Sequence, residues 1–271
     1  MTPRGPAAPD PGPTSPTSPT SPVAPDPSPT SPTSPTSPTV DLIVLAGGRG
    51  SRLGGALKPT VEVDGRSLLS RVLDARPLAR QTIVVGPEAA RPPATRPDTT
   101  PLIWTLEDPP FGGPAAGIAA GIAALFAPTA PHPADWILLL ACDLPWATDA
   151  APLLIAAATD PNLPSAVDGI HLVDETGHAQ WLVAIYRGRG LAASVARLGA
   201  EVRGASMRAL LGGLQLRGLP DPSGVSRDVD TWQDVSQTTE LLRATELLRA
   251  TPLLQSGAEP RTPPSDLKET P

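Results

Sequence analysis

A loop that combines glycines with basic side chains lies between residues 45 and 59, where the sequence runs L-A-G-G-R-G-S-R-L-G-G-A-L-K-P. Glycines let the backbone come close to a ligand, so that successive N–H groups can point at an anion. Arg49, Arg52 and Lys58 add positive charge to those N–H groups. These residue types support phosphate binding, and the loop predicts a site for a nucleoside triphosphate.

Two familiar phosphate-binding loops do not fit this segment. The Walker form ends in Gly-Lys followed by Ser or Thr, and the sequence contains no Gly-Lys pair. The dinucleotide form G-x-G-x-x-G begins with Gly48 and Gly50, but Leu53 stands where its third glycine belongs. The remaining alternative is a plain glycine-rich turn, which the basic residues at these spacings disfavour.

The pattern L-A-G-G-x-x-S-R-L-G-G-x-x-K-P resembles the first loop of nucleotidyltransferases that activate phosphorylated small molecules. The resemblance is strongest to the molybdenum cofactor guanylyltransferase family. It implies that the loop binds the nucleotide and that Arg52 and Lys58 also act in catalysis. The nucleotide-binding residues implied in this loop are Leu45, Ala46, Gly47, Gly48, Gly50, Ser51, Arg52 and Lys58.

Asp143 follows the apolar run Trp136–Ala141, in the segment Ala-Cys-Asp-Leu-Pro. A carboxylate at the end of a strand, facing a triphosphate loop, is well placed to hold Mg²⁺. An aspartate in this position is also typical of a simple turn or helix cap. The segment resembles the metal-binding segment of the same family, which implies that Asp143 is catalytic and that Mg²⁺ is the cofactor.

A second glycine-rich stretch runs from residue 107 to 117, as E-D-P-P-F-G-G-P-A-A-G. Its backbone could lie against a planar base, and Glu107 and Asp108 could accept hydrogen bonds from the N–H groups of guanine. The stretch resembles the family's base-binding segment, which implies roles for Asp108 and Gly113. The choice between the two carboxylates stays open, and an ordinary loop leading into a helix is the alternative.

Two later segments complete the resemblance. Residues 177–187, G-H-A-Q-W-L-V-A-I-Y-R, resemble the strand that borders the acceptor pocket, although Trp181 replaces a usual proline. The acceptor-binding residues implied there are His178, Gln180 and Arg187; for Arg187 the alternative is a solvated surface arginine.

The closing segment, residues 227–234, reads R-D-V-D-T-W-Q-D and resembles the family's closing D-x-D-T/N-x-N-T segment before the last helix. Asp230 is either a second metal ligand or part of a helix cap. Thr231 is the expected N-cap, with Asp234 at the capping-box position.

Alternating strands and helices must position these groups. The expected strands are Val40–Ala46, Gln81–Val85, Leu102–Trp104 and Trp136–Ala141, and the expected helices are Ser67–Leu78 and Gly113–Phe126. This alternation predicts an α/β fold with a doubly wound, mostly parallel sheet and helices on both faces. The family resemblance implies a Rossmann-like nucleotide-diphospho transferase fold. Ligands of such sheets bind beyond the carboxyl ends of the strands.

The chain is expected to hold a single domain with disordered tails. Residues 1–39 contain 14 of the 38 prolines, mostly in Pro-Thr-Ser repeats, and predict an extended, solvated arm. Residues 40–235 are the expected nucleotidyltransferase domain, and 236–255 a C-terminal helical extension that carries the repeat E-L-L-R-A-T. Residues 256–271 again predict a disordered tail.

Composition narrows the class of protein. A net charge of −6 without a basic stripe argues against a nucleic-acid partner. The single cysteine, Cys142, excludes a disulfide framework and a cysteine-built metal site. Prolines rather than an apolar segment follow Met1, and the longest apolar runs are too short to span a bilayer, so we expect a cytoplasmic protein without a membrane partner.

The resemblance, which covers residues 40–235, implies transfer of GMP from GTP to molybdopterin with release of pyrophosphate. It implies GTP and molybdopterin as substrates, and molybdoenzymes or other cofactor-biosynthesis proteins as partners. The alternatives are the cytidylyltransferase of the same cofactor or another small-molecule nucleotidyltransferase, and, more remotely, a non-catalytic nucleotide-binding regulator or cofactor chaperone. Gly47-Gly48 favours guanine, whereas Leu57 and Gly86-Pro87 depart from the family's pattern.

Overall fold

The computed structural model describes residues 5, 38–48, 50–93, 100–128 and 131–250. The strands are β1 Val40–Leu45, β2 Glu62–Val63, β3 Arg66–Ser67, β4 Thr82–Val85, β5 Leu102–Thr105, β6 Trp136–Ala141, β7 Gly169–Val173, β8 Ala179–Arg187 and β9 Leu216–Pro220. The α-helices are α1 Leu68–Val72, α2 Pro114–Leu125, α3 Ala147–Ala158, α4 Gly188–Leu198, α5 Met207–Leu211 and α6 Trp232–Ala250. Short 3₁₀ helices include η1 Ser51–Leu53, η2 Lys58–Thr60 and η3 Leu73–Leu78.

Seven of these strands form one sheet in the order β5-β4-β1-β6-β8-β7-β9. Strand β1 pairs in parallel with both β4 and β6, and β5 pairs in parallel with β4. Strand β8 runs antiparallel to β6 and to β7, while β9 is parallel to β7. The predicted doubly wound, mostly parallel sheet is therefore confirmed, with β8 as its one reversed strand.

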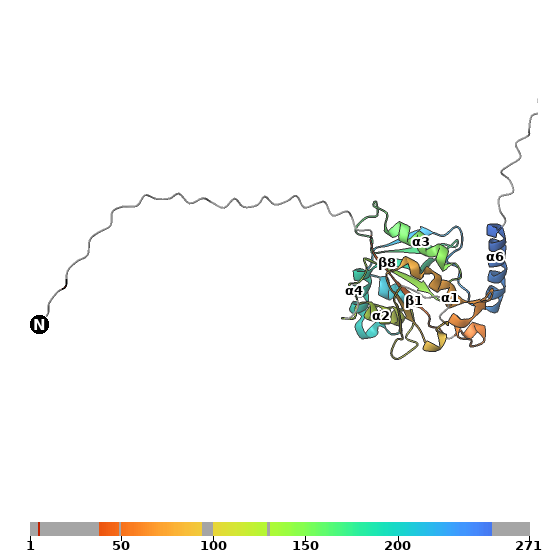
Figure 1. The fold of residues 1–271 in the computed structure, drawn as a ribbon, viewed down its shortest axis with the longest axis horizontal. Coiled ribbons are helices and arrows are strands. Elements are labelled where there is room, and N and C mark those ends of the chain that lie inside the picture. The colour runs from red at the N-terminus through yellow and green to blue at the C-terminus, as the bar shows by residue number, and fades with distance from the viewer. Residues whose placement is uncertain (1–4, 6–37, 49, 94–99, 129–130, 251–271) are drawn as a thin grey trace, which may run out of the picture. The chain divides into compact units, whose positions relative to one another are not determined.

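Helices cover both faces of the sheet, because the central strands are apolar on both sides. In β1, Leu42 and Val44 pack into a core with α1 and α3, whereas Ile43 and Leu45 pack against α2, α4 and α5. This alternation follows from the period of two in a strand. Figure 1 shows the two groups of helices on opposite sides of β1.

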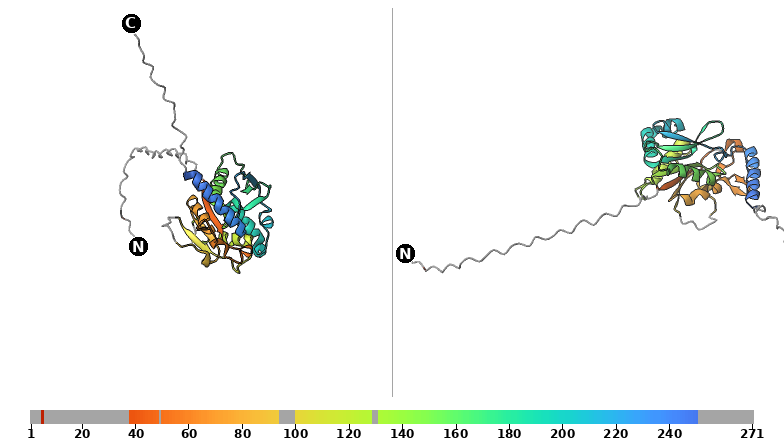
Figure 2. Two further views of the ribbon diagram at one scale, coloured as in Figure 1. Left: turned by 90° about the vertical axis from the view of Figure 1, so that its right-hand side faces the viewer. Right: turned by 90° about the horizontal axis from the view of Figure 1, so that it is seen from above.

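A third, smaller core joins segments that are distant in the sequence. It contains Leu53 of η1, Val61 and Val63 beside the β2–β3 hairpin, and Val229, with Leu242 of α6 packed against it. Helix α6 lies along β2, as the blue helix beside the orange segment in Figure 2. The amide of Asp64 donates to the Thr239 hydroxyl, and Arg243 pairs with Asp64 at 2.7 Å.

Several elements differ from their predicted bounds. The expected helix over Ser67–Leu78 is α-helical only over Leu68–Val72, since Pro77 interrupts the backbone hydrogen bonds and the rest is 3₁₀. Helix α6 runs without a break through residue 235, where the domain was expected to end. The sequence did not predict α3, α4 or α5.

The expectations for the arm over residues 1–39 and the tail over 256–271 fall, apart from residues 5, 38 and 39, outside the described residues. Among the helices of the described ranges, none is both long enough and apolar enough to cross a lipid bilayer.

Candidate active site

The site lies where β1 and β6 end side by side. Leu45 is in register with Ala141, and the Cys142 amide donates to the Leu45 carbonyl at 3.0 Å. Asp143 therefore follows directly at the carboxyl ends of the parallel strands, which form the carboxyl edge of the sheet; their amino ends form its amino edge. Connections from β1 lead first toward β4 and β5 and then back to β6 on the other side. The carboxyl ends of β1 and β6 therefore flank a topological switch point, the place where open α/β sheets bind ligands.

The loop after β1 is closed by its own backbone. Gly50 has a φ of 53°, and its carbonyl accepts hydrogen bonds from the amides of Leu53 and Gly55 at 2.8 and 3.1 Å. A Cβ at Gly50 would lie 2.1 Å from the Ala56 carbonyl oxygen, so only glycine fits there. Leu53 is buried in the third core and anchors the loop. Arg49 lies outside the described residues.

Lys58, at the end of this loop, connects two acidic segments. Its ammonium lies 2.5 Å from Asp143 and also donates to Asp230. Arg52 pairs with the other oxygen of Asp230 at 2.9 Å. Burial alone would lower the pKa of Lys58, but the charges of and hydrogen bonds to Asp143 and Asp230 outweigh it and raise that pKa above its usual range. Lys58 is therefore fully charged at physiological pH.

The closing segment lies beneath the β6 loop. The amide of Val229 donates to the Asp143 carbonyl at 3.0 Å, and the Val229 side chain is fully buried. Thr231 and Asp234 form the predicted capping box: the Thr231 hydroxyl accepts from the Asp234 amide, and the Asp234 carboxylate accepts from the amides of Asp230 and Thr231. This cap leaves the Asp230 carboxylate to Lys58 and Arg52.

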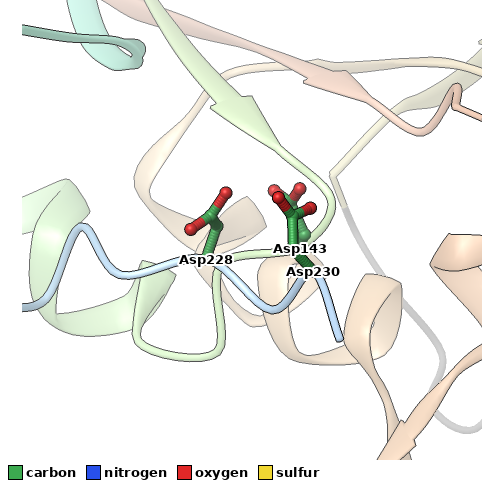
Figure 3. A group of neighbouring side chains, drawn as sticks. All are labelled: Asp143, Asp228 and Asp230. Atoms are coloured by element: carbon green, nitrogen blue, oxygen red, sulfur yellow. The ribbon is translucent and has the colours of Figure 1, made fainter. Parts of the chain in front are cut away.

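Three carboxylates converge beside Lys58. Asp143, Asp228 and Asp230 each offer an oxygen, and these atoms all lie within 4.8 Å of one another. Figure 3 shows Asp143 on the loop after β6 and the other two on the closing segment, with their carboxyl groups side by side. Burial and the negative charges of Asp143 and Asp230 raise the pKa of Asp228. Such crowded oxygens fit a hard divalent cation.

Asp228 is the member of this cluster that the sequence analysis missed. The signal was the D-V-D spacing in an extended segment. With Val229 buried in the third core, its two neighbours must point away from that core and toward Asp143.

The stretch predicted to bind the base, residues 107–117, follows β5 and lies at the same edge of the sheet. Gly113 is the N-cap residue of α2, and the Gly112 amide donates to Glu107 at 3.1 Å. The second carboxylate oxygen of Glu107 is buried and has no hydrogen-bond partner among the described residues, whereas Asp108 is exposed. The structure thus places both carboxylates at this edge, in the segment after β5 rather than after β1 or β6.

A pocket of about 270 Å³ adjoins the cluster and shares Asp228 with it. It lies between the turn that joins β7 to β8 and the closing segment, and its lining includes Asp174, Gln180, Asp221, Gly224, Arg227 and Asp228. Gln180, one of the predicted acceptor-binding residues, therefore lines this pocket. His178 lies in the same turn, exposed, with Nδ1 2.6 Å from the Thr176 hydroxyl.

Arg187 is not brought to this site. It pairs in register with Trp136, at the amino end of β6, and its guanidinium lies 4.5 Å from the centre of the Trp136 ring. Its Nε donates to the Val167 carbonyl at 2.9 Å. The six residues of β6 separate this position from Asp143 by roughly 17–20 Å.

Comparisons with known proteins identify the family of the chain. A family model described as "MobA-like NTP transferase domain" matches residues 42–217. The molybdenum cofactor guanylyltransferase of Vibrio cholerae is 34% identical over 131 residues, which make up 48% of this chain and 60% of that protein. The chain thus spans about three fifths of this relative's length.

Two solved structures share the fold. Molybdopterin-guanine dinucleotide biosynthesis protein A from Archaeoglobus fulgidus superposes with a TM-score of 0.55 at 21% identity, covering 75% of this chain and 99% of that one. The 2-C-methyl-D-erythritol 4-phosphate cytidylyltransferase from Thermus thermophilus gives a TM-score of 0.51 at 15% identity, covering 74% of this chain and 98% of that one.

Proposed function

Because this chain belongs to the MobA-like NTP transferase domain family, we propose that it is a molybdenum cofactor guanylyltransferase. An oxygen of the terminal phosphate of molybdopterin attacks the α-phosphorus of GTP. The bond between that phosphorus and the oxygen bridging to the β-phosphate breaks, and pyrophosphate leaves. The product is molybdopterin guanine dinucleotide. The observation that carries the proposal is the contact of Lys58 with both Asp143 and Asp230 at the switch point.

Catalysis in this proposal is alignment and charge neutralisation. The acceptor phosphate is itself the nucleophile, so the protein needs no covalent intermediate. Cys142, the nearest thiol, is buried, and burial raises its pKa above the usual range, which makes it unsuited to nucleophilic attack.

The loop after β1 is the proposed triphosphate cradle. Backbone N–H groups around Gly47, Gly48 and Gly50 would face the phosphates, as expected for the nucleotide-binding set from Leu45 to Lys58. Arg52 and Lys58 would neutralise the charge that builds up on the leaving pyrophosphate. Both side chains are held by carboxylates, so triphosphate binding would compete with Asp143 and Asp230 for them.

Mg²⁺ is the proposed cofactor, held by Asp143 and Asp230 with Asp228 as a third ligand. The mutual proximity of the three carboxylates and the raised pKa of Asp228 support this assignment, since a cation would relieve their repulsion. When bound there, the metal would supply positive charge that offsets the negative charge of the triphosphate.

Asp108, in the loop after β5, and Gly113, the N-cap of α2, remain the proposed base-binding residues. Glu107 is a further candidate, because it has a buried carboxylate oxygen without a partner among the described residues. A carboxylate that accepts from guanine N1–H and the 2-amino group would reject cytosine, which lacks this pair of donors.

Pyrophosphate release tests the proposal, with purified protein, molybdopterin and Mg²⁺, and GTP compared with CTP, ATP and UTP. Release with GTP alone is the expected result. A preference for CTP would keep the chemistry and overturn the guanine assignment. Silence with all four nucleotides, together with tight GTP binding, would point instead to a regulator or chaperone that binds nucleotide without turning it over.

A further inference from the structure

Two of the carboxylates that line the pocket beside the aspartate cluster already accept hydrogen bonds from the protein. Asp174 accepts hydrogen bonds from the Thr176 hydroxyl, the His178 amide and the Gln180 side chain, which lower its pKa to about 2. Asp221 is buried and accepts from the amides of Val225 and Ser226. These two acids fix the shape of the turn and of the closing segment, and they are not free to bind a ligand.

Arg227 is the one cation in the pocket's described lining. Four carboxylates line the same pocket, yet the Arg227 guanidinium has no hydrogen bond or ion pair with any described residue. Its guanidinium lies against the backbone of Gly224. A Cβ on Gly224 would come within 2.6 Å of Arg227 Nε, 2.7 Å of Nη2 and 2.8 Å of Cζ.

Gly224 therefore serves as a platform for Arg227. Its φ of 66° is a conformation that glycine adopts easily and other residues rarely adopt. The amide of Gly224 donates to the Asp221 carbonyl at 3.4 Å, and the Arg227 amide donates to the Gly224 carbonyl at 3.3 Å, which closes the turn. The turn sets the guanidinium in the pocket one residue before Asp228.

We infer that Arg227 binds the phosphate of the acceptor in this pocket. The inference rests on the proposed function, which requires an acceptor phosphate. A guanidinium presents a planar fork of N–H donors that matches two phosphate oxygens. Because Asp228 belongs to both the pocket and the aspartate cluster, a phosphate held by Arg227 lies next to the proposed metal ligands.

The remainder of the pocket indicates the chemistry of the rest of the acceptor. The Gln180 side-chain nitrogen is held by Asp174 at 2.7 Å, which leaves its oxygen to accept a hydrogen bond. Glu175, exposed in the same lining, adds further acceptor oxygens. Acidic walls repel a second anion and favour N–H donors. The pocket thus fits a phosphomonoester whose other end carries hydrogen-bond donors, as an aminated heterocycle does.

Arg227→Ala, Arg227→Lys and Gly224→Ala test this assignment, with molybdopterin as the probe. Arg227→Ala should raise the molybdopterin Kd and KM about 10- to 100-fold and leave GTP binding unchanged. Arg227→Lys should recover part of the loss, since it keeps the charge and loses the fork. Gly224→Ala keeps the charge but displaces the guanidinium, so it should also weaken molybdopterin binding.

Arg189→Ala is the matched control, because Arg189 is an exposed arginine near the amino edge of the sheet. It should leave both affinities unchanged. GMP transfer by the wild-type protein with an unaltered molybdopterin KM in Arg227→Ala would overturn the inference and leave the proposed function standing. Absence of molybdopterin binding by the wild-type protein would overturn both.

Discussion

The two edges of the sheet each hold an aspartate with a basic partner, but the two groups are built differently. At the amino edge, Asp41 is fully buried. It accepts from Arg80 Nε and Nη2 at 3.1 and 2.9 Å, from the Ala134 amide at 3.0 Å and from Gln81 at 3.4 Å. Every oxygen has donors, and the acid and the base are balanced one to one.

At the carboxyl edge, three aspartates share Lys58 and the exposed Arg52. Burial, together with the negative charges of Asp143 and Asp230, raises the pKa of Asp228, which means that ionising this carboxyl costs stability. A satisfied acid stabilises the fold, whereas a crowded one is suited to receive a cation from solution. The presence of a carboxylate beside a strand does not distinguish these cases; the number of its donors and acidic neighbours does.

The largest effect that we expect is the loss of turnover in Asp143→Ala, at the carboxyl edge. Turnover should fall by roughly 100-fold or more, because the variant loses a proposed metal ligand and the main partner of Lys58. GTP affinity measured without Mg²⁺ should change far less, since the loop after β1 remains. Steady-state pyrophosphate release and equilibrium GTP binding give the two quantities. Unchanged turnover would remove Asp143 from the metal site.

Asp41→Asn tests the amino edge, where we expect the substitution to lower stability and leave turnover unchanged. It leaves Arg80 beside a buried amide, and the free energy of unfolding should fall by about 3 kcal/mol, toward the low end for a broken buried pair because the Arg80 side chain is 36% exposed. Urea unfolding measures the loss. Turnover of the folded fraction should match that of the wild type.

Glu88→Gln removes the exposed pair with Arg91 and should cost less than about 1 kcal/mol. If Glu88→Gln and Asp41→Asn lowered the free energy of unfolding by similar amounts, burial would not determine how much the Asp41–Arg80 pair contributes to stability. A loss of turnover in Asp41→Asn would show that the two edges are not independent.

The same contrast explains what the sequence could predict. The strand–loop–strand framework of β1 and β6 was predictable, because largely apolar runs and a glycine-rich loop are local signals. Helix α3 was not, since its alanine-rich sequence contains Pro152 and no clear polar face. The cluster was predictable in part: Asp143 follows a strand directly, while Asp228 depends on where Val229 is buried.

The length and the direction of β8 together explain why Arg187 lies far from the other proposed acceptor residues. Gln180 begins this strand at the carboxyl edge, and Arg187 ends it at the amino edge, because β8 runs antiparallel to β6. Nine residues of strand span roughly 25–30 Å. Sequence similarity placed both residues in one segment, but strand direction is set by long-range pairing that the segment itself does not encode.

The smallest effect that we expect is the change in stability in Asp228→Asn. It tests whether the neighbouring aspartates at the carboxyl edge make the ionised Asp228 carboxylate unfavourable. Because burial and the charges of Asp143 and Asp230 raise its pKa above the usual 3.8, the folded protein binds this proton more tightly than the unfolded chain does. Stability of the metal-free wild type should therefore fall as pH rises from 3.8 through the raised pKa. Asparagine carries no such cost.

In EDTA at neutral pH, Asp228→Asn should thus be more stable than the wild type by about 0.5 kcal/mol, a small gain because the Asp228 side chain is only partly desolvated and solvent still screens its charge. The gain should disappear when the pH falls below 3.8, where the wild-type carboxyl is protonated in both states. Added Mg²⁺ should reverse the order, since the wild type has one more ligand to offer. If the difference in unfolding free energy depended on neither pH nor Mg²⁺, Asp228 would behave as an ordinary surface carboxylate. A third metal ligand would then have to come from another residue.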